Sequence, residues 1–218
     1  MAPSRHVWHT TICASTLLGL AVSGARAEEA DGPPPYRYQE VRVGIVGAPA
    51  PTVRQDGANW GGGESRGYRY GITYLRGCAP FNDYTGTVWG AQFSIGTYNV
   101  QTADNIDGEV LNQGIVDVYY GFQYGIVQTD ALRGFAEILP YVGVGVSDMD
   151  LVKGGEYKAS LGAAYEMGIR TGVYLTEHQW LAGLTAAYVY GASQINADQT
   201  VNLHTNGFQF GGELGYRF

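Results

Sequence analysis

Ten charged residues stand at alternating positions of segments that are otherwise apolar or rich in glycine, and they are the residues best suited to chemistry. They comprise five acids and five bases: Glu40, Arg42, Arg69, Asp117, Glu137, Lys158, Glu166, Arg170, Glu213 and Arg217. Equal numbers of opposite charges favour ion pairing, which a low-dielectric surrounding strengthens. Glu166 and Arg170 are four residues apart, about 13 Å in a strand, so each needs a partner on a neighbouring strand. We expect a network of ion pairs that closes a lumen, with a gated pore or a proton path as the alternative.

A catalytic site would need a nucleophile and a base, and the sequence offers one candidate residue. His204 stands in the tetrapeptide His-Thr-Asn-Gly, which resembles the His-x-Ser-Asn motif of outer-membrane lipid A deacylases. The serine is missing here, and the spacing differs. We therefore assign no catalytic residue and keep His204 as an alternative rim site.

Metal and cofactor sites have few possible ligands in this chain. Beyond the N-terminal segment, Cys78 is the only cysteine, and His178 and His204 are the only histidines, so neither an internal disulfide nor a structural zinc site is expected. Six acids in the expected connections could bind divalent cations that bridge lipopolysaccharide, or could only add solubilising charge. They are Asp104, Asp107, Glu109, Asp148, Asp150 and Asp198. We predict no metal and no cofactor.

The first 27 residues have the features of a secretory signal peptide. Arg5 precedes the apolar stretch Thr10–Val22, and Ala25 and Ala27 form a small-x-small cleavage site. Residues 28–37 contain three consecutive prolines, which predict a short extended N-terminal extension. The chain has 20 acidic against 13 basic residues, a balance that disfavours nucleic acid as a partner.

The elements that must position the charged residues are β-strands of a single domain, residues 38–218. Only 15% of the residues are charged, and 33 of 218 are glycine. No run of about 18 apolar residues follows the signal peptide, which excludes helical membrane spans. Apolar and polar residues instead alternate with a period of two in eight segments. These are Val41–Ile45, Tyr68–Tyr74, Trp89–Ile95, Val116–Tyr124, Ile138–Val146, Tyr165–Val173, Trp180–Tyr190 and Phe208–Phe218.

The expected connections alternate in length, with longer ones at 48–65, 100–109, 148–156 and 192–205 and shorter ones at 77–83, 127–132 and 176–177. An even number of strands joined in this way is typical of an eight-stranded antiparallel transmembrane β-barrel. A soluble barrel is the alternative, but its outer face would carry many Lys and Glu residues, whereas the polar face here is rich in glycine. Pro140 predicts a bulge or irregular hydrogen bonding, because a closed barrel has no free edge.

Three segments resemble the last strands of small bacterial outer-membrane barrels of the OmpA transmembrane-domain and opacity-protein type. They are Leu139–Ser147, Leu161–Leu175 and Asn206–Phe218. In that group the last strand ends in Phe, with aromatic or apolar residues at alternate upstream positions, and this pattern is the signal that the assembly machinery reads. Phe210, Leu214, Tyr216 and Phe218 match the pattern, and Gly212 does not. No peptidoglycan-binding domain follows the last strand, so the resemblance does not imply cell-wall anchoring.

The resemblance implies export to the bacterial outer membrane and a role in envelope integrity or in surface interaction through extracellular loops, without catalysis. The implied partners are outer-membrane lipid and lipopolysaccharide, the barrel assembly machinery, and host or surface ligands. A lipid A modifying enzyme of the deacylase or oxidase type and a narrow channel are the alternatives. Both use the same architecture, and only the side chains of the lumen and rim can separate them.

Overall fold

The computed structural model describes residues 36–49, 51–55, 58–60, 66–82, 85–100, 109–129, 133–153, 156–196 and 200–218. The predicted signal peptide and nearly all of the predicted N-terminal extension therefore lie outside the described residues. Ten strands make up the described part: β1 (Tyr36–Pro49), β2 (Thr52–Gln55), β3 (Ala58–Trp60), β4 (Arg66–Asn82), β5 (Thr85–Val100), β6 (Glu109–Gln128), β7 (Arg133–Lys153), β8 (Glu156–Glu177), β9 (Trp180–Asn196) and β10 (Thr200–Arg217). Within these ranges, no helix is long and apolar enough to span a bilayer.

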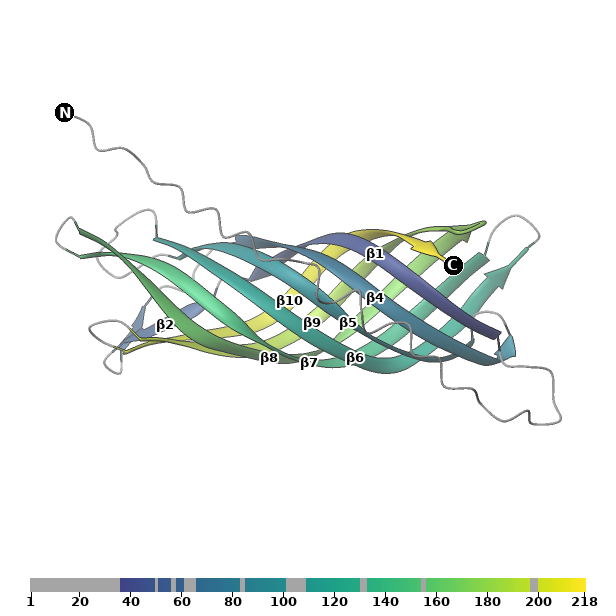
Figure 1. Ribbon diagram of the computed structural model, residues 1–218, viewed down its shortest axis with the longest axis horizontal. Helices are drawn as coiled ribbons and strands as arrows, with labels where there is room; N and C mark the ends of the chain where they lie inside the picture. The colour runs from purple at the N-terminus through teal and green to yellow at the C-terminus, as the bar shows by residue number, and fades with distance from the viewer. Residues whose placement is uncertain are drawn as a thin grey trace, which may run out of the picture. The chain divides into compact units, whose positions relative to one another are not determined.

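Eight of these strands close into an antiparallel barrel (Figure 1). Each of β1 and β4 to β10 pairs with the next in chain order, and β10 returns to pair with β1 from Gly47↔Phe210 to Glu40↔Arg217. Two backbone hydrogen bonds between Gln39 and Phe218, of 3.0 and 2.9 Å, extend this closing ladder to the last residue. The predicted fold class, an eight-stranded antiparallel barrel, is confirmed.

The two ends of the barrel differ in what they carry. One end, called the terminal end below, holds the start of β1, the end of β10 and the turns after β4, β6 and β8. The other end, called the far end, holds the connections after β1, β5, β7 and β9. Within the first far-end connection, β2 and β3 form a hairpin that pairs with the start of β10, where Thr52 lies opposite His204.

Alternation places apolar side chains outside the barrel, as lipid contact requires. On β10, Phe208, Phe210 and Leu214 are 62–65% exposed, while Gln209 and Glu213 between them are buried. From Phe208 to Phe218 the strand rises by ten residues, which at the usual tilt crosses about 25 Å, the height of the apolar band of a membrane barrel. This outward apolar surface distinguishes the fold from that of a soluble barrel.

At the far end the pattern is inverted. Here six apolar side chains point inward, none more than 3% exposed, and form one core: Ala48, Tyr98, Leu111, Met149, Ile195 and Leu203. The outward neighbours Thr97, Asn112 and Gln194 are polar and exposed. This apolar far-end core means that the far end has the inside-apolar, outside-polar order of a water-soluble protein.

The strands around the far-end core are longer than the sequence predicted. The expected connections 148–156 and 192–205 are mostly strand, because β7 continues to Lys153 and β10 starts at Thr200. Those boundaries were wrong because outward polar residues such as Asp148 resemble loop residues when apolar alternation is the only criterion.

Pro140 interrupts one ladder without shifting its register. Tyr119↔Tyr141 and Phe122↔Ile138 are successive pairs in the same register, and Leu139 and Pro140 between them have no partner residue on β6. The expected irregular hydrogen bonding is confirmed. The other alternative, a bulge, does not occur at Pro140, since the register shift of this ladder lies between Gly125 and Val127.

Candidate functional site

The structure places the predicted lumen residues inside the barrel. Nine of the ten have described side chains, and none of these is more than 5% exposed. The tenth, Lys158, lies in β8 opposite Leu151, but its side chain is outside the described part of the chain. The nine side chains form two clusters at different heights.

The first, called the terminal cluster, contains three acids and three arginines: Glu40, Arg42, Glu137, Arg170, Glu213 and Arg217. Arg42 donates two hydrogen bonds to Glu137, of 2.8 and 3.0 Å, and two to Glu40, of 2.8 and 2.5 Å. Arg217 also donates to Glu40, with its Nε at 2.6 Å. Charge is balanced within the cluster, so each buried ion has an opposite partner.

Tyr174 ties the terminal cluster together. Its hydroxyl donates to Glu213 Oε2 at 2.7 Å and accepts from Arg170 at 2.9 Å, while Arg170 also donates to Glu213 at 2.5 Å. The guanidinium of Arg42 lies 4.1 Å from the centre of the Tyr174 ring, and Phe135 stacks on this ring with a centroid distance of 5.0 Å. Aromatic faces thus stabilise the arginines in addition to the carboxylates.

The second, called the far cluster, contains Arg69, Asp117 and Glu166. Arg69 Nη1 donates to both Glu166 oxygens, at 2.8 and 3.0 Å, and Arg69 Nη2 donates to Ser94 at 2.7 Å. Asp117 Oδ2 lies 3.7 Å from Arg69 Nη2, and Asp117 Oδ1 has no hydrogen-bond partner. This cluster holds two carboxylates and one guanidinium.

Some ion pairs cross the lumen and others join neighbouring strands, so the expectation of partners on neighbouring strands holds for part of the network. Arg69 on β4 binds Glu166 on β8, and Arg42 on β1 binds Glu137 on β7. Three other pairs join adjacent strands: Arg217 on β10 with Glu40 on β1, Arg170 on β8 with Glu137 on β7 at 3.4 Å, and Arg42 on β1 with Glu213 on β10 at 3.7 Å. Long arginine side chains span a narrow lumen, so strands on opposite sides can be bridged directly.

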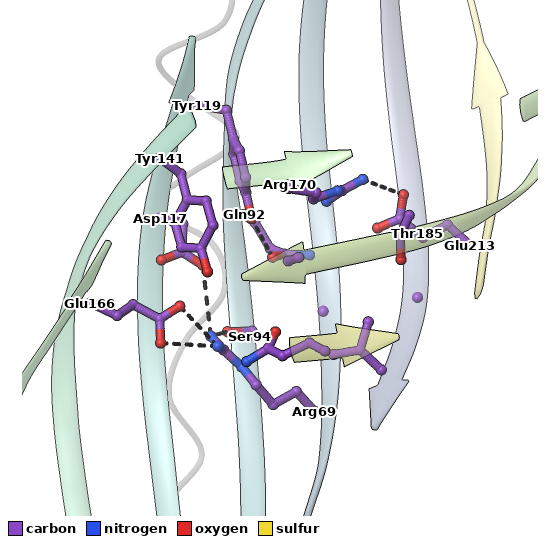
Figure 2. Close-up of a pocket in the computed structure, with 15 residues that line it drawn as sticks. Arg69, Gln92, Ser94, Asp117, Tyr119, Tyr141, Glu166, Arg170, Thr185 and Glu213 are labelled. Carbon is purple, nitrogen blue, oxygen red and sulfur yellow. Dashed lines mark hydrogen bonds and ion pairs between the residues drawn. The ribbon is translucent and has the colours of Figure 1, made fainter. Parts of the chain in front are cut away.

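A small cavity lies between the two clusters (Figure 2). Its volume is about 30 Å³, which holds about one or two water molecules. Figure 2 shows Asp117 and Glu166 on one side of it and Arg170 with Glu213 on the other. With the far-end core above and side chains such as Leu75 and Tyr38 below, both buried, the interior is filled rather than open.

Sequence reasoning missed the inward tyrosines that share the lumen with the charges. Tyr38, Tyr98, Tyr141 and Tyr174 are all at most 6% exposed. Each lies against a glycine of its own or an adjacent strand: a Cβ at Gly77, Gly67, Gly168 or Gly183 would overlap the respective ring. Each tyrosine stands at an inward position of the two-residue alternation and has a glycine nearby on the adjacent strand. Together these two features could have identified the inward tyrosines from the sequence.

His204, kept above as an alternative rim site, lies within β10, where it is paired with Ala192 and with Thr52. Its side chain is half-buried, and its position in the alternation faces outward, away from both clusters. Among the described residues, no three His, Cys, Asp or Glu side chains are grouped so as to hold a metal ion.

The four residues of the proposed assembly signal share the outer face of β10. Phe210, Leu214 and Phe218 are 58–64% exposed, and Tyr216 packs edge-on against Trp180 with a centroid distance of 5.2 Å. Gly212 lies on the same face between them and leaves a shallow apolar groove lined by residues such as Leu184 and Leu214. The structure thus gives the positions of these residues but does not test their role in assembly.

Among known proteins, several outer-membrane proteins of solved structure resemble this chain at low sequence identity. No protein-family model matches the chain, and no curated protein sequence matches it significantly. The outer membrane protein OprG from Pseudomonas aeruginosa is 16% identical, covers 85% of this chain and 97% of its own, and has a TM-score of 0.46. Neisserial surface protein A is 14% identical, with coverages of 84% and 97% and a TM-score of 0.43.

The attachment invasion locus protein Ail of Yersinia pestis is also similar. It is 14% identical, with coverages of 83% and 98% and a TM-score of 0.36. A second structure of Ail contains the heparin analogue sucrose octasulfate. The assignment of this chain as a small membrane barrel rests on its own closed sheet and outward apolar band.

Proposed function

We propose that this chain is a non-conducting outer-membrane barrel that supports envelope integrity and presents its far-end connections at the cell surface. The observation that carries the proposal is the closed interior. Two ion-pair clusters and the far-end core fill it, and the cavity between the clusters has a volume of only about 30 Å³. A barrel of this kind is a scaffold, so recognition falls to the residues outside the apolar band.

Location in the bacterial outer membrane, and export by the signal peptide at residues 1–27, are parts of the same proposal. A bilayer admits only structures that satisfy every backbone polar group internally, and closed barrels of this type are typical of outer membranes. Both ends of the barrel chain lie at the terminal end, which we assign to the periplasmic side. The proposed partners are outer-membrane lipid and lipopolysaccharide, the barrel assembly machinery, and surface ligands of the far end.

The closed interior argues against the narrow-channel alternative. For lipid A modification, His204 faces outward, half-buried, opposite Thr52 and Ala192, and neither of these paired residues is a carboxylate that could complete a triad. We therefore expect lipid A from cells with and without the protein to have the same mass spectrum. A protein-dependent mass shift that His204→Ala abolishes would replace the scaffold proposal by an enzymatic one.

Two experiments test the proposal directly. In planar bilayers, the refolded protein should give no conductance steps above those of protein-free membranes, and a regular open level would refute the closed interior. Orientation is tested in a Cys78→Ser background, with Gly155→Cys in the far-end connection after β7 and Gln179→Cys in the exposed turn after β8. A membrane-impermeant maleimide should label position 155 in intact cells, and position 179 only after lysis.

A further inference from the structure

The buried charges of the described barrel are not balanced. The terminal cluster has three carboxylates and three guanidinium groups, whereas the far cluster has Asp117 and Glu166 against Arg69 alone. Lys158 cannot correct this, because it is eight residues along β8 from Glu166, about 26 Å, which exceeds the length of a lysine side chain. Asp117 and Glu166 are neighbours on the inner wall, since both pair with Gly143 of the strand between them.

Asp117 is the carboxylate with the poorer set of partners. Glu166 receives two short hydrogen bonds from Arg69, whereas Asp117 is 3.7 Å from that guanidinium. Its Oδ1 is buried and has no hydrogen-bond partner, and the side chain as a whole is 1% exposed. A carboxylate in this situation is strongly disfavoured unless a positive charge joins it.

The space for that charge is present. Asp117 and Glu166 line the cavity between the clusters, whose volume fits a species the size of a water molecule (Figure 2). Thr185 and Gln209 add neutral polar side chains to the same wall. The titratable and polar groups facing Asp117 from the surrounding strands are Arg69, Gln92, Ser94, Tyr119, Tyr141, Glu166, Arg170, Gln209 and Glu213.

We propose that this cavity is a binding site for one positive charge at Asp117, carried either by a proton or by a small monovalent cation. Either would neutralise the excess carboxylate. A divalent cation does not suit the site, because Arg69 and Arg170 supply repulsive charges around only a few carboxylates. The proposal goes beyond the scaffold function, since a scaffold with a filled lumen needs no ion site.

A matched pair of isosteric variants tests the site. Asp117→Asn removes the excess charge and should leave the urea midpoint of the refolded protein at pH 7 unchanged or raise it. Glu166→Gln breaks the double hydrogen bond with Arg69 and should lower the midpoint clearly. If Asp117→Asn lowers the midpoint as much as Glu166→Gln, Asp117 is an ordinary partner of Arg69 and the proposal is overturned.

Two measurements identify the carrier of the positive charge, and both begin with the unmodified protein. A proton gives an infrared carbonyl stretch of a protonated carboxyl group at pH 7, which Asp117→Asn should remove. A metal cation makes the urea midpoint rise when sodium or potassium chloride replaces choline chloride at constant ionic strength. Either result supports the site, and the absence of both overturns it.

Discussion

Arg42 of β1 and Glu137 of β7 face each other across the lumen and are joined by two parallel hydrogen bonds, of 2.8 and 3.0 Å. Both side chains are fully buried. This forked geometry is specific to arginine and places Arg42 at the centre of the terminal cluster, where it also binds Glu40. The stability of the barrel should therefore depend strongly on this single side chain.

Arg42→Ala should lower the free energy of unfolding by about 3–5 kcal/mol, because it leaves buried carboxylates without their partner. Arg42→Lys keeps the charge but cannot form the fork, so its loss should be intermediate. Urea unfolding in lipid vesicles, followed by tryptophan fluorescence, measures both. Equal stability of Arg42→Ala and the unmodified protein would mean that water reaches the cluster.

The hydroxyl of Tyr174 gives a more selective test. Tyr174→Phe retains the ring beneath Arg42 but removes the bridge between Arg170 and Glu213. Since it leaves buried polar groups with one partner fewer, the expected loss is about 1–3 kcal/mol. Tyr190→Phe, on the exposed outer face, is the matched control and should change stability by less than about 0.5 kcal/mol.

Two adjacent glycines of β10 should respond in opposite ways to alanine. A Cβ at Gly211 would overlap the backbone carbonyl of Ile45, whereas at Gly212 it would meet only the carbonyl oxygen of Gly183 at 3.6 Å. Gly211→Ala should therefore destabilise the barrel by about 1–3 kcal/mol or prevent closure, and Gly212→Ala should be neutral or stabilising. Comparable losses in the two variants would contradict the closeness of β1 and β10 at Gly211.

The last residue should matter for assembly more than for stability. Deletion of Phe218 removes an outward aromatic ring and two backbone hydrogen bonds with Gln39. We expect a several-fold lower amount of inserted protein in cells, with nearly normal refolding into detergent in vitro. Phe218→Ala separates the contributions, because it removes the ring and keeps both hydrogen bonds. Normal insertion of both variants would show that the terminal pattern is not read.

Much of the arrangement of side chains inside and outside the barrel follows from the alternation of apolar and polar residues with a period of two. Alternation alone indicates that Glu166 and Arg170 face the same side of one strand, and both are buried in the lumen. It cannot indicate that Arg69 is the partner of Glu166, because pairs across a lumen depend on strand stagger and tilt, which arise only when the sheet closes. Partners on opposite walls are therefore beyond a one-dimensional pattern.

The far end could not be predicted for a different reason. Met149 and Leu203 lie inside while their outward neighbours are polar, so the rule that holds along the apolar band is inverted there. If strands are identified only by outward apolar residues, they are predicted to end at the membrane surface. Beyond that surface, Met149 and Leu203 point inward and polar residues point outward, which is the pattern of a strand in a soluble protein. The sequence analysis did not apply this second pattern.

The inverted far end has a consequence for how this protein tolerates change. The core of Tyr98, Leu111, Met149, Ile195 and Leu203 holds the strand ends together beyond the lipid. From Asp148 to Lys153, β7 continues for about 16 Å along the strand beneath the connection that follows it. With the far end at the cell surface, as proposed above, foreign peptides inserted at residues 154–155 would follow strands that extend past the bilayer, and the barrel would serve as a carrier for displaying sequences on a cell.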